Sequence, residues 1–322
     1  MEQITVIVPA YNAEKTIGKC LDSLLETINR AGRVFKVKII VIDDGSRDST
    51  LDILNEYATN NPDILVFHQE NKGIGAAREV GLRLADGDYL AWCDSDDWVE
   101  PDWLLSMYQV LIKYDADIVR FRAISENRVH GSPESLYTGE INIWNREEAI
   151  YEFLIHKKIN GILWASLFRK SLFDGLHFNE NLLYYEDADM TWQVLQRVNK
   201  VVRVDDAKYH WVISEDSLSN GKTSIGRIRC IYPFWGNIAE SVRSNSEWHG
   251  IALEHHIVAN FGCLKRMYIE GISNKEIEHD IRRTIINNLG VLMGMQPSVI
   301  WKLQVLLVVF CGPIARVASK FV

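Results

Sequence analysis

The sequence predicts an α/β fold: a doubly wound, mostly parallel sheet followed by a helical C-terminal region. Apolar runs recur through roughly the first 120 residues, and amphipathic helical patterns separate them. Such alternation is typical of a parallel sheet covered by helices on both faces. Right-handed crossovers between neighbouring strands make a sheet of this kind doubly wound. From about residue 224 onward, the apolar spacing is helical.

The elements can be assigned in order along the chain. We expect buried strands at four apolar runs, residues 4–8, 37–42, 64–69 and 88–93. We expect helices at residues 17–28, 48–58, 75–85, 188–198, 228–243, 251–269 and 275–294. The polar stretch at 214–224 separates the mixed pattern from the helical one. We therefore predict two domains, residues 1–220 and residues 221–322.

The composition argues against several classes of protein. Of 322 residues, 47% are hydrophobic and 24% are charged, which is typical of a globular chain. The net charge of -8, without a long Lys/Arg tract, argues against nucleic acid as a partner. Met1 leads into the first apolar run without a basic leader, so we expect no signal peptide and a cytoplasmic location. The cysteines are scattered and free of CxxC spacing, which favours a reducing compartment: Cys20, Cys93, Cys230, Cys263 and Cys311.

Carboxylates gather where predicted strands end. Asp43 and Asp44 follow the second strand, and the sequence DSDD, residues 94–97, follows the fourth. In an open parallel sheet these ends meet at one edge, where ligands bind. Repulsion among so many carboxylates favours a divalent cation with oxygen ligands, which would in turn hold a diphosphate. Each motif alone also has a structural interpretation. Asp-Gly-Ser is a common turn, and DSDD, just before Pro101, is able to cap the helix that starts near that residue.

Four motifs carry a resemblance, in the order VIVPAYNAEKTIGKCLDSLL, VIDDGSRDST, NKGIGAAREVGL and GDYLAWCDSDDWVEPDWL. They resemble the family 2 glycosyltransferases of the GT-A fold, of the bacterial surface-polysaccharide type. The similarity runs from Ile4 to about Ser219 and is extended by LWASLFRKSLF, FNENLLYYEDADM and YHWVISEDSLS. It implies an inverting, metal-dependent transfer of a sugar from a nucleotide-sugar to a glycan or lipid-linked acceptor in polysaccharide biosynthesis. The implied donor is a UDP-hexose or a UDP-N-acetylhexosamine, and residues 1–220 would be the glycosyltransferase domain.

The resemblance implies a nucleotide-sugar site at the strand ends. Asp44, or in second place Asp43, would accept the N3–H of uracil, because a carboxylate is an acceptor only. Arg78 would reach the base or the diphosphate, and Asp94 would hold the ribose or a metal-bound water. Asp96 would bind Mn²⁺ or Mg²⁺, and Asp94 is assigned to the metal site as well. The remaining residues implied for the nucleotide-sugar are Pro9, Ala10, Tyr11 and Ser95, with Tyr11 packing on the ribose or the uracil.

The general base is expected in the motif YYEDADM. Inverting transfer needs a group that takes the proton from the acceptor hydroxyl as it attacks. The resemblance implies Asp187 as this base and Glu186 as an acceptor-binding residue. The structural alternative is that both acids favour the positive end of a helix whose first turn they occupy.

Several further positions have two interpretations each. Trp164 would stack on a sugar face or lie in the core, and His210 would bind the metal or play a structural part. Ser217 and Ser219 lie in a polar segment that would close over the diphosphate as a lid. This sequence departs from the family at two positions: Glu79 stands where Asn is usual, and Ser166 stands where Lys is frequent.

The C-terminal tail, residues 299–322, combines apolar bulk with Trp301, Lys302, Arg316 and Lys320. Three alternatives stay open for it. It would contact the inner face of the cell membrane peripherally, pack on the preceding helices, or join copies of the chain as a homo-oligomer.

Two other functions compete with sugar transfer. A nucleotide-sugar-binding protein without activity is expected to lack the metal-binding Asp or the base, and both are present. A nucleotidyltransferase is expected to carry a Gly-rich phosphate loop after the first strand, and PAYNAEKT has none.

Overall fold

The computed structural model describes residues 1–127, 139–179, 182–213, 223–296 and 298–311. The chain divides into two compact units. The first unit comprises Met1–Phe153, Lys157–Leu182 and Glu186–Asn220. The second unit comprises Leu154–His156, Leu183–Tyr185 and Gly221–Val322.

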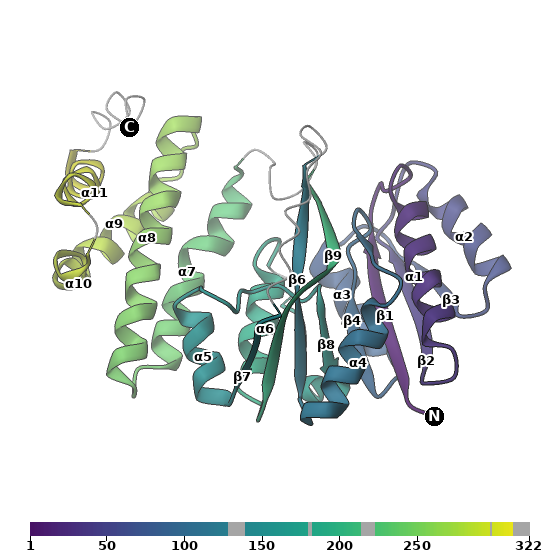
Figure 1. Cartoon of the computed structure of the whole chain (residues 1–322). Coiled ribbons are helices and arrows are strands. Elements are labelled where there is room, and N and C mark those ends of the chain that lie inside the picture. The colour runs from purple at the N-terminus through teal and green to yellow at the C-terminus, as the bar shows by residue number, and fades with distance from the viewer. Residues whose placement is uncertain (128–138, 180–181, 214–222, 297, 312–322) are drawn as a thin grey trace. The chain divides into compact units, whose positions relative to one another are not determined.

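A mixed sheet runs through the first unit in the order β3-β2-β1-β4-β8-β6-β9-β5, and β7 pairs with β9 (Figure 1). Neighbours among β1 to β4 are parallel, whereas β8 is antiparallel to β4 and β6. The predicted class, a mostly parallel α/β sheet with a helical C-terminal region, is confirmed. The strands are β1 Gln3–Ala10, β2 Lys36–Asp43, β3 Ile64–His68, β4 Tyr89–Trp92, β5 Trp98–Val99, β6 Ile118–Asn127, β7 Ile141–Trp144, β8 Ser166–Arg169 and β9 Val201–Ile213.

The parallel strands are apolar because helices cover both of their faces. Ile4, Val6 and Val8 of β1 belong to a core that includes side chains of α1 and α4. Ile40 and Ile42 of β2 pack on α3 instead. The helices of this unit are α1 Ile17–Ala31, α2 Thr50–Asn60, α3 Ile74–Leu84, α4 Trp103–Tyr114, α5 Arg146–Leu154 and α6 Glu186–Leu195, with a 3₁₀ turn, η1, at Lys170–Phe173.

The strand register brings three polar loops to one edge of the sheet. Ala10 at the end of β1 pairs with Asp43 at the end of β2, and Asp43 pairs with His68. On the other side of β1, Ile7 pairs with Trp92, so the chain leaves β4 at the same edge. Ligands of open parallel sheets bind at this edge, the carboxyl edge.

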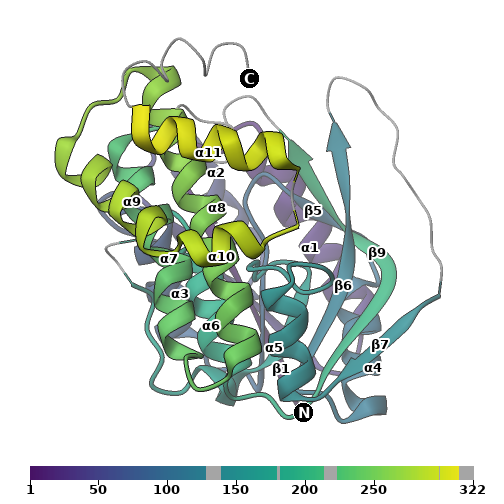
Figure 2. The same cartoon turned by 90° about the vertical axis from the view of Figure 1, so that its left-hand side faces the viewer.

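Helices make up the described part of the second unit beyond residue 222, with α7 and α8 packed side by side (Figure 2). A single helix was expected at 275–294, and this is wrong. Asn288, with φ −110 and ψ 24, leaves the helical conformation and divides the segment into two helices. The helices are α7 Ile225–Ser241, α8 Ser246–Glu270, α9 Lys275–Asn287, α10 Leu289–Gly294 and α11 Val299–Cys311.

The apolar tail helix α11 contributes to the core of the second unit. Val305, Val308 and Val309 are buried there, while Leu303 and Phe310 on the same helix are exposed. Among the described residues, no helix is both long enough and apolar enough to cross a membrane. Contact of the tail with a membrane or with a second copy stays a prediction, and Arg316 and Lys320 lie outside the described residues.

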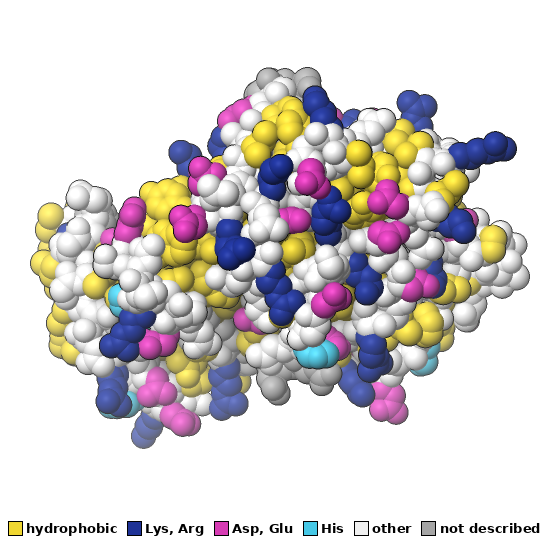
Figure 3. Space-filling view, turned by 90° about the horizontal axis from the view of Figure 1, so that it is seen from below, with side chains coloured by type: hydrophobic (Ala, Val, Ile, Leu, Met, Phe, Trp, Pro, Cys, Tyr) yellow, Lys and Arg dark blue, Asp and Glu magenta, His cyan; other side chains and the backbone are white. Residues whose placement is uncertain are grey.

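The surface carries charges of both signs. On the face shown in Figure 3, Lys and Arg side chains are interspersed with Asp and Glu side chains.

Packing of α3 on β1 predicts that Gly81→Ala destabilises the fold. A Cβ on Gly81 would lie 2.3 Å from Cγ2 of Ile7, a fully buried β-branched side chain. Overpacking of this kind lowers the free energy of unfolding by about 1–3 kcal/mol. Gly18→Ala is the matched control, because its Cβ would meet only the Tyr57 hydroxyl at an ordinary 3.6 Å. Urea denaturation followed by circular dichroism should show loss at Gly81 alone; equal behaviour of the two variants would contradict this packing.

Candidate active site

Asp43 is the last residue of β2 and is fully buried. Its Oδ2 accepts a hydrogen bond from His68 Nδ1 at 2.7 Å and a longer one from the Ser46 N–H at 3.4 Å. Its Oδ1 is buried and has no hydrogen-bond partner among the described residues. An unpaired buried carboxylate oxygen is unfavourable and needs an explanation, such as a ligand that donates to it.

Asp44, the next residue, is also buried, but both of its oxygens are used within the chain. Oδ1 accepts from Gln69 Nε2 at 2.7 Å and from the Lys72 N–H at 2.9 Å, and Oδ2 accepts from the Gly73 N–H at 2.8 Å. Asp44 therefore holds the loop that leads into α3. The sequence favoured Asp44 over Asp43 as the acceptor for uracil, and the hydrogen bonding favours the reverse order.

The loop after β1 is tied to the loop after β2. The Asn12 N–H donates to Ser46 Oγ at 2.9 Å, and Asn12 Oδ1 accepts from the Arg47 N–H at 2.8 Å. Pro9 and Ala10 are buried, whereas the Tyr11 side chain is 46% exposed. Of the residues predicted at this position, Tyr11 is thus the one whose side chain is available to a ligand.

The loop after β4 carries Asp94, Ser95 and Asp96, all half-buried, and the fully buried Asp97. Asp97 Oδ1 accepts from the Val212 N–H at 2.8 Å, and Oδ2 accepts from the Tyr209 hydroxyl at 2.6 Å. Burial, followed by repulsion from Asp94 and Asp96, raises the pKa of Asp97 to about 8.

The alternative that DSDD caps the helix after Pro101 is wrong for Asp97. Helix α4 begins at Trp103 with Asp102 at its N-cap, and both Asp97 oxygens are bound by β9. Among the described residues, no group of three or more His, Cys, Asp and Glu side chains could hold a metal ion. A metal at Asp94 and Asp96 would therefore need oxygens from a ligand to complete its coordination.

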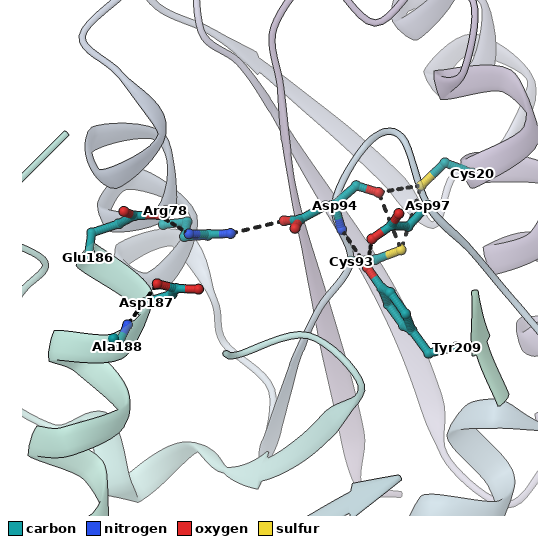
Figure 4. Close-up of polar contacts among 9 residues, drawn as sticks. All are labelled: Cys20, Arg78, Cys93, Asp94, Asp97, Glu186, Asp187, Ala188 and Tyr209. Atoms are coloured by element: carbon teal, nitrogen blue, oxygen red, sulfur yellow. Dashed lines mark hydrogen bonds and ion pairs between the residues drawn. The ribbon is translucent and has the colours of Figure 1, made fainter. Parts of the chain in front are cut away.

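Arg78 of α3 lies buried between two carboxylates (Figure 4). Its Nη2 donates to Asp94 Oδ1 at 3.0 Å, and its Nη1 donates to Glu186 Oε1 at the start of α6. Burial lowers the pKa of Arg78, but the two carboxylates outweigh it and raise the pKa above its usual value. Both terminal nitrogens therefore pair with carboxylates of this chain. The predicted contact of Arg78 with a base or diphosphate stays a prediction.

Helix α6 opens with Glu186 and Asp187, directly after Tyr185 in a left-handed conformation with φ 70. A non-glycine residue in this region is strained, and such strain is concentrated at functional sites. Glu186 is buried against Arg78, whereas Asp187 is half-buried. Figure 4 shows the Asp187 carboxylate on the side of α6 that faces Arg78, with Oδ1 accepting from the Ala188 N–H at 2.8 Å.

Burial also shifts the titration of these two acids. It raises the pKa of Glu186 to about 7, although Arg78 acts in the opposite direction. It likewise raises the pKa of Asp187 above its ordinary value, again against the effect of Arg78. Perturbed carboxyl groups of this kind are candidates for acid–base chemistry.

The two departures from the family pattern have local partners. Glu79 accepts from His177 Nδ1 and from the Phe178 N–H, both at 2.9 Å, and so holds the segment after β8. Ser166 Oγ accepts from Nε of the buried Arg120 at 3.0 Å. Sequence reasoning missed Arg120, whose guanidinium also binds Asn160 and the carbonyl of Ile162, because nothing in the sequence distinguishes this strand residue.

The remaining predicted positions lie along β9 and beside it. Trp164 stacks on Tyr209 with ring centroids 5.0 Å apart, which places it against the core. His210 is buried, stacks on Trp98 and pairs through Nε2 with Glu100 Oε1 at 2.8 Å. These contacts favour a structural part for His210. Ser217 and Ser219 lie outside the described residues, so the lid stays a prediction.

Three comparisons describe what the chain is similar to. Residues 5–176 match the family "Glycosyl transferase family 2". The glycosyltransferase GlyA of Streptococcus pneumoniae is 33% identical over 225 residues, which is 68% of this chain and 32% of that protein. The chain thus spans about a third of the length of this relative.

Two solved structures share the fold. The Staphylococcus aureus TarS 1-349 structure in complex with UDP-GlcNAc has a TM-score of 0.64 at 20% identity and covers 89% of each chain. The mannosyltransferase PcManGT from Pyrobaculum calidifontis, in complex with GDP-Man and Mn²⁺, has a TM-score of 0.53 at 16% identity, covering 99% of this chain and 86% of the other. The family match covers more than half of the 322 residues, and the predicted resemblance is confirmed: the chain belongs to glycosyl transferase family 2.

Proposed function

We propose that this chain transfers a sugar, with inversion, from a UDP-sugar to a glycan or lipid-linked acceptor in polysaccharide biosynthesis. One observation carries the proposal. Arg78 joins a donor-side carboxylate, Asp94, to the start of the helix that carries a second carboxylate, Asp187. Group transfer between two substrates needs one set of groups for the leaving diphosphate and another for the attacking hydroxyl.

The nucleotide is proposed to bind at the ends of β1 and β2. The unpaired Oδ1 of Asp43 would accept the N3–H of uracil, and this donor would satisfy a buried oxygen that has no described partner. A carboxylate here selects for a base that presents an N–H donor. The exposed Tyr11 would pack on the uracil or the ribose. Pro9 and Ala10 would shape the floor of this pocket by their backbone.

The donor set fits a divalent cation in part. Asp94 and Asp96 offer hard oxygen ligands, and their charge already raises the pKa of Asp97, so positive charge is favourable nearby. Mg²⁺ and Mn²⁺ are often held by one or two carboxylates, with phosphate oxygens completing the shell. Asp96 would hold the cation, with Asp94 and Ser95 beside the ribose and diphosphate. When bound, the cation neutralises charge on the leaving diphosphate.

Asp187 is proposed as the general base. It is less buried than Glu186, and Figure 4 places its carboxylate toward Arg78 and Asp94. Its raised pKa brings its basicity closer to neutral pH, which suits a group that must take a proton from a hydroxyl. Glu186 is engaged by Arg78, so its part would be to hold the guanidinium in place, beside the acceptor-binding part that the resemblance implies.

We predict that UDP binding depends on a divalent cation and on Asp96. Calorimetry with UDP should show about 10-fold tighter binding with Mn²⁺ than without, which corresponds to about 1.4 kcal/mol. Asp96→Ala should remove this difference, since the cation loses its carboxylate. Asp52→Ala, at an exposed acid in the first turn of α2, is the control and should keep the difference. Equal affinity of the wild-type chain with and without Mn²⁺ would contradict the metal site.

We predict that Asp187→Asn strongly slows sugar transfer and spares donor binding. A positioned base contributes about 10²–10⁴-fold, so kcat should fall by this factor while the Kd for UDP stays unchanged. In the wild-type chain, kcat should fall as the pH drops through the raised pKa of Asp187, because the protonated acid cannot accept a proton.

Asp189→Asn is the control for the base, since Asp189 lies in the same first turn of α6 and its Oδ2 accepts from Gln193. If Asp187 and Asp189 acted only by stabilising the positive end of the helix dipole, Asp187→Asn and Asp189→Asn would lose similar activity. Loss of activity in Glu186→Gln with a working Asp187→Asn would assign the base to Glu186. A chain that binds UDP-sugar but transfers no sugar to any acceptor would favour the binding-protein alternative.

We predict that Arg78→Gln destabilises the first unit by about 3–5 kcal/mol at a pH high enough to ionise Glu186, because this buried carboxylate then lacks its cation. The loss relative to the wild-type chain should grow as the pH rises above about 7. Only the ionised form of Glu186 is destabilised by the loss of the guanidinium. The pKa of Glu186 is about 7 with Arg78 present and would be higher without it, so the difference between the two chains appears as the pH rises above about 7. Urea denaturation at several pH values measures this, with the exposed Arg83→Gln as control. A loss independent of pH would show that Glu186 is not its source.

A further inference from the structure

Behind the carboxylates of the DSDD loop lies a buried cluster that the proposed chemistry leaves without a part. It contains Tyr209 of β9 together with Asp97, Cys93 and Cys20 (Figure 4). Tyr209 is fully buried, so it does not touch a ligand directly.

The Tyr209 hydroxyl makes two hydrogen bonds to the same short loop. It accepts from the backbone N–H of Asp94 at 3.1 Å and donates to Asp97 Oδ2 at 2.6 Å. The other oxygen of Asp97 accepts from the Val212 N–H on the same strand at 2.8 Å. Both ends of the segment 94–97 are therefore attached to β9.

The turn itself is closed by contacts to the Asp94 carbonyl. The Asp97 N–H donates to this oxygen at 3.0 Å. The thiols of Cys20 and Cys93 approach the same oxygen at 3.6 and 3.7 Å. The backbone of Asp94 is thus held at both its N–H and its carbonyl, and only its side chain points toward Arg78.

The Tyr209 ring is itself held by aromatic neighbours. Trp164 stacks on it at a centroid distance of 5.0 Å and an interplanar angle of 19°, and Trp103 lies edge-on at 5.9 Å. Trp103 is fully buried. Close packing on two sides leaves the phenol little freedom, so its hydroxyl is a stable reference point for the loop.

We propose that Tyr209 is a positioning residue for donor binding, which rests on the function proposed above. Asp94 and Asp96 lie two residues apart and repel each other when ionised, so an unrestrained loop would spread them apart. The Tyr209 hydroxyl holds Asp94 and Asp97 at a set spacing and thereby aims the Asp94 and Asp96 carboxylates before cation and diphosphate arrive. Such preorganisation tightens binding because the loop need not be ordered by the ligand.

The test compares binding of UDP with Mn²⁺, of UDP alone and of uridine, by calorimetry. Tyr209→Phe keeps the ring and removes the hydroxyl. It should weaken UDP binding with Mn²⁺ by about 10-fold and weaken uridine binding far less, because uridine brings neither a diphosphate nor a cation to the Asp96 carboxylate. A merely structural loss would weaken uridine and UDP alike, and that result would overturn the proposal.

Tyr89→Phe is the matched control. Tyr89 is buried at the opposite end of β4, and its hydroxyl donates to a carboxylate, Glu2 Oε1, at 2.8 Å. Removing the Tyr89 hydroxyl deletes a tyrosine–carboxylate hydrogen bond from β4, the strand that leads into the DSDD loop. It should leave the Mn²⁺-dependent affinity for UDP unchanged. A 10-fold loss in this control would overturn the assignment to Tyr209.

A second pair of variants keeps the proposal testable if Tyr209→Phe fails to fold. Asp97→Asn can still pair with Tyr209 and Val212, whereas Asp97→Ala cannot. The proposal expects UDP affinity with Mn²⁺ to survive in Asp97→Asn and to fall about 10-fold in Asp97→Ala. Equal loss in both variants would mean that the carboxyl group of Asp97 is needed for a reason other than its attachment to β9, and this result would overturn the proposal.

The outcomes also separate this inference from the function it rests on. A wild-type chain that binds no UDP overturns the proposed function and this inference together. If the wild-type chain binds UDP with Mn²⁺ and Tyr209→Phe binds it with the same affinity, this inference alone is overturned.

Discussion

The buried guanidinium of Arg78 is the interaction on which the rest of the site depends. A charge taken out of water is strongly unfavourable unless opposite charges surround it. Arg78 meets this condition through Asp94 on one side and Glu186 on the other, and both carboxylates come from other parts of the sheet and its helices. The end of β4, the middle of α3 and the start of α6 are therefore tied together by a single side chain.

This arrangement couples two halves of the candidate site electrostatically. The Asp94 carboxylate, which is 24% exposed, and the buried Glu186 carboxylate share the Arg78 guanidinium. Burial still raises the pKa of Glu186 and of Asp187 against the pull of Arg78, so desolvation is the larger effect there. A site with a firmly ionised guanidinium beside acids of raised pKa is suited to holding anions and moving a proton in the same place.

The carboxylates of the DSDD loop differ in burial and in hydrogen bonding although they are close in sequence. Asp97 turns inward and is bound by two groups of β9, while Asp94 and Asp96 stay half-buried. The inward residue anchors the loop, and the others remain at its surface. Similarly, Asp44 holds the loop into α3 with both oxygens, while one oxygen of neighbouring Asp43 has no hydrogen-bond partner in the part of the chain that the structure describes. Adjacent acids thus divide into anchors and candidate ligand contacts.

The sequence by itself determined the layout of the parallel strands and the sheet edge at which the candidate site is proposed. Largely apolar runs such as residues 4–8 are typical of strands buried on both faces, and polar residues that follow neighbouring parallel strands meet at one edge of the sheet. The division of the segment 275–294 at Asn288 was not predicted, since the apolar spacing continues across it. The alternation of apolar and polar residues reports burial, and a backbone break at one residue leaves that pattern unchanged.

Only the tertiary structure distinguished the neighbouring acids by their burial and hydrogen bonds. Asp43 and Asp44, or Asp97 and its neighbours, are chemically alike and adjacent, so the sequence cannot rank them. The difference arises from groups that are distant in the chain: the backbone of Lys72 and Gly73 for Asp44, and Tyr209 and Val212 for Asp97. The hydrogen bonds and burial of each acid depend on where distant strands and helices come to lie in the fold. The periodicity of apolar residues in the sequence contains no information about these positions.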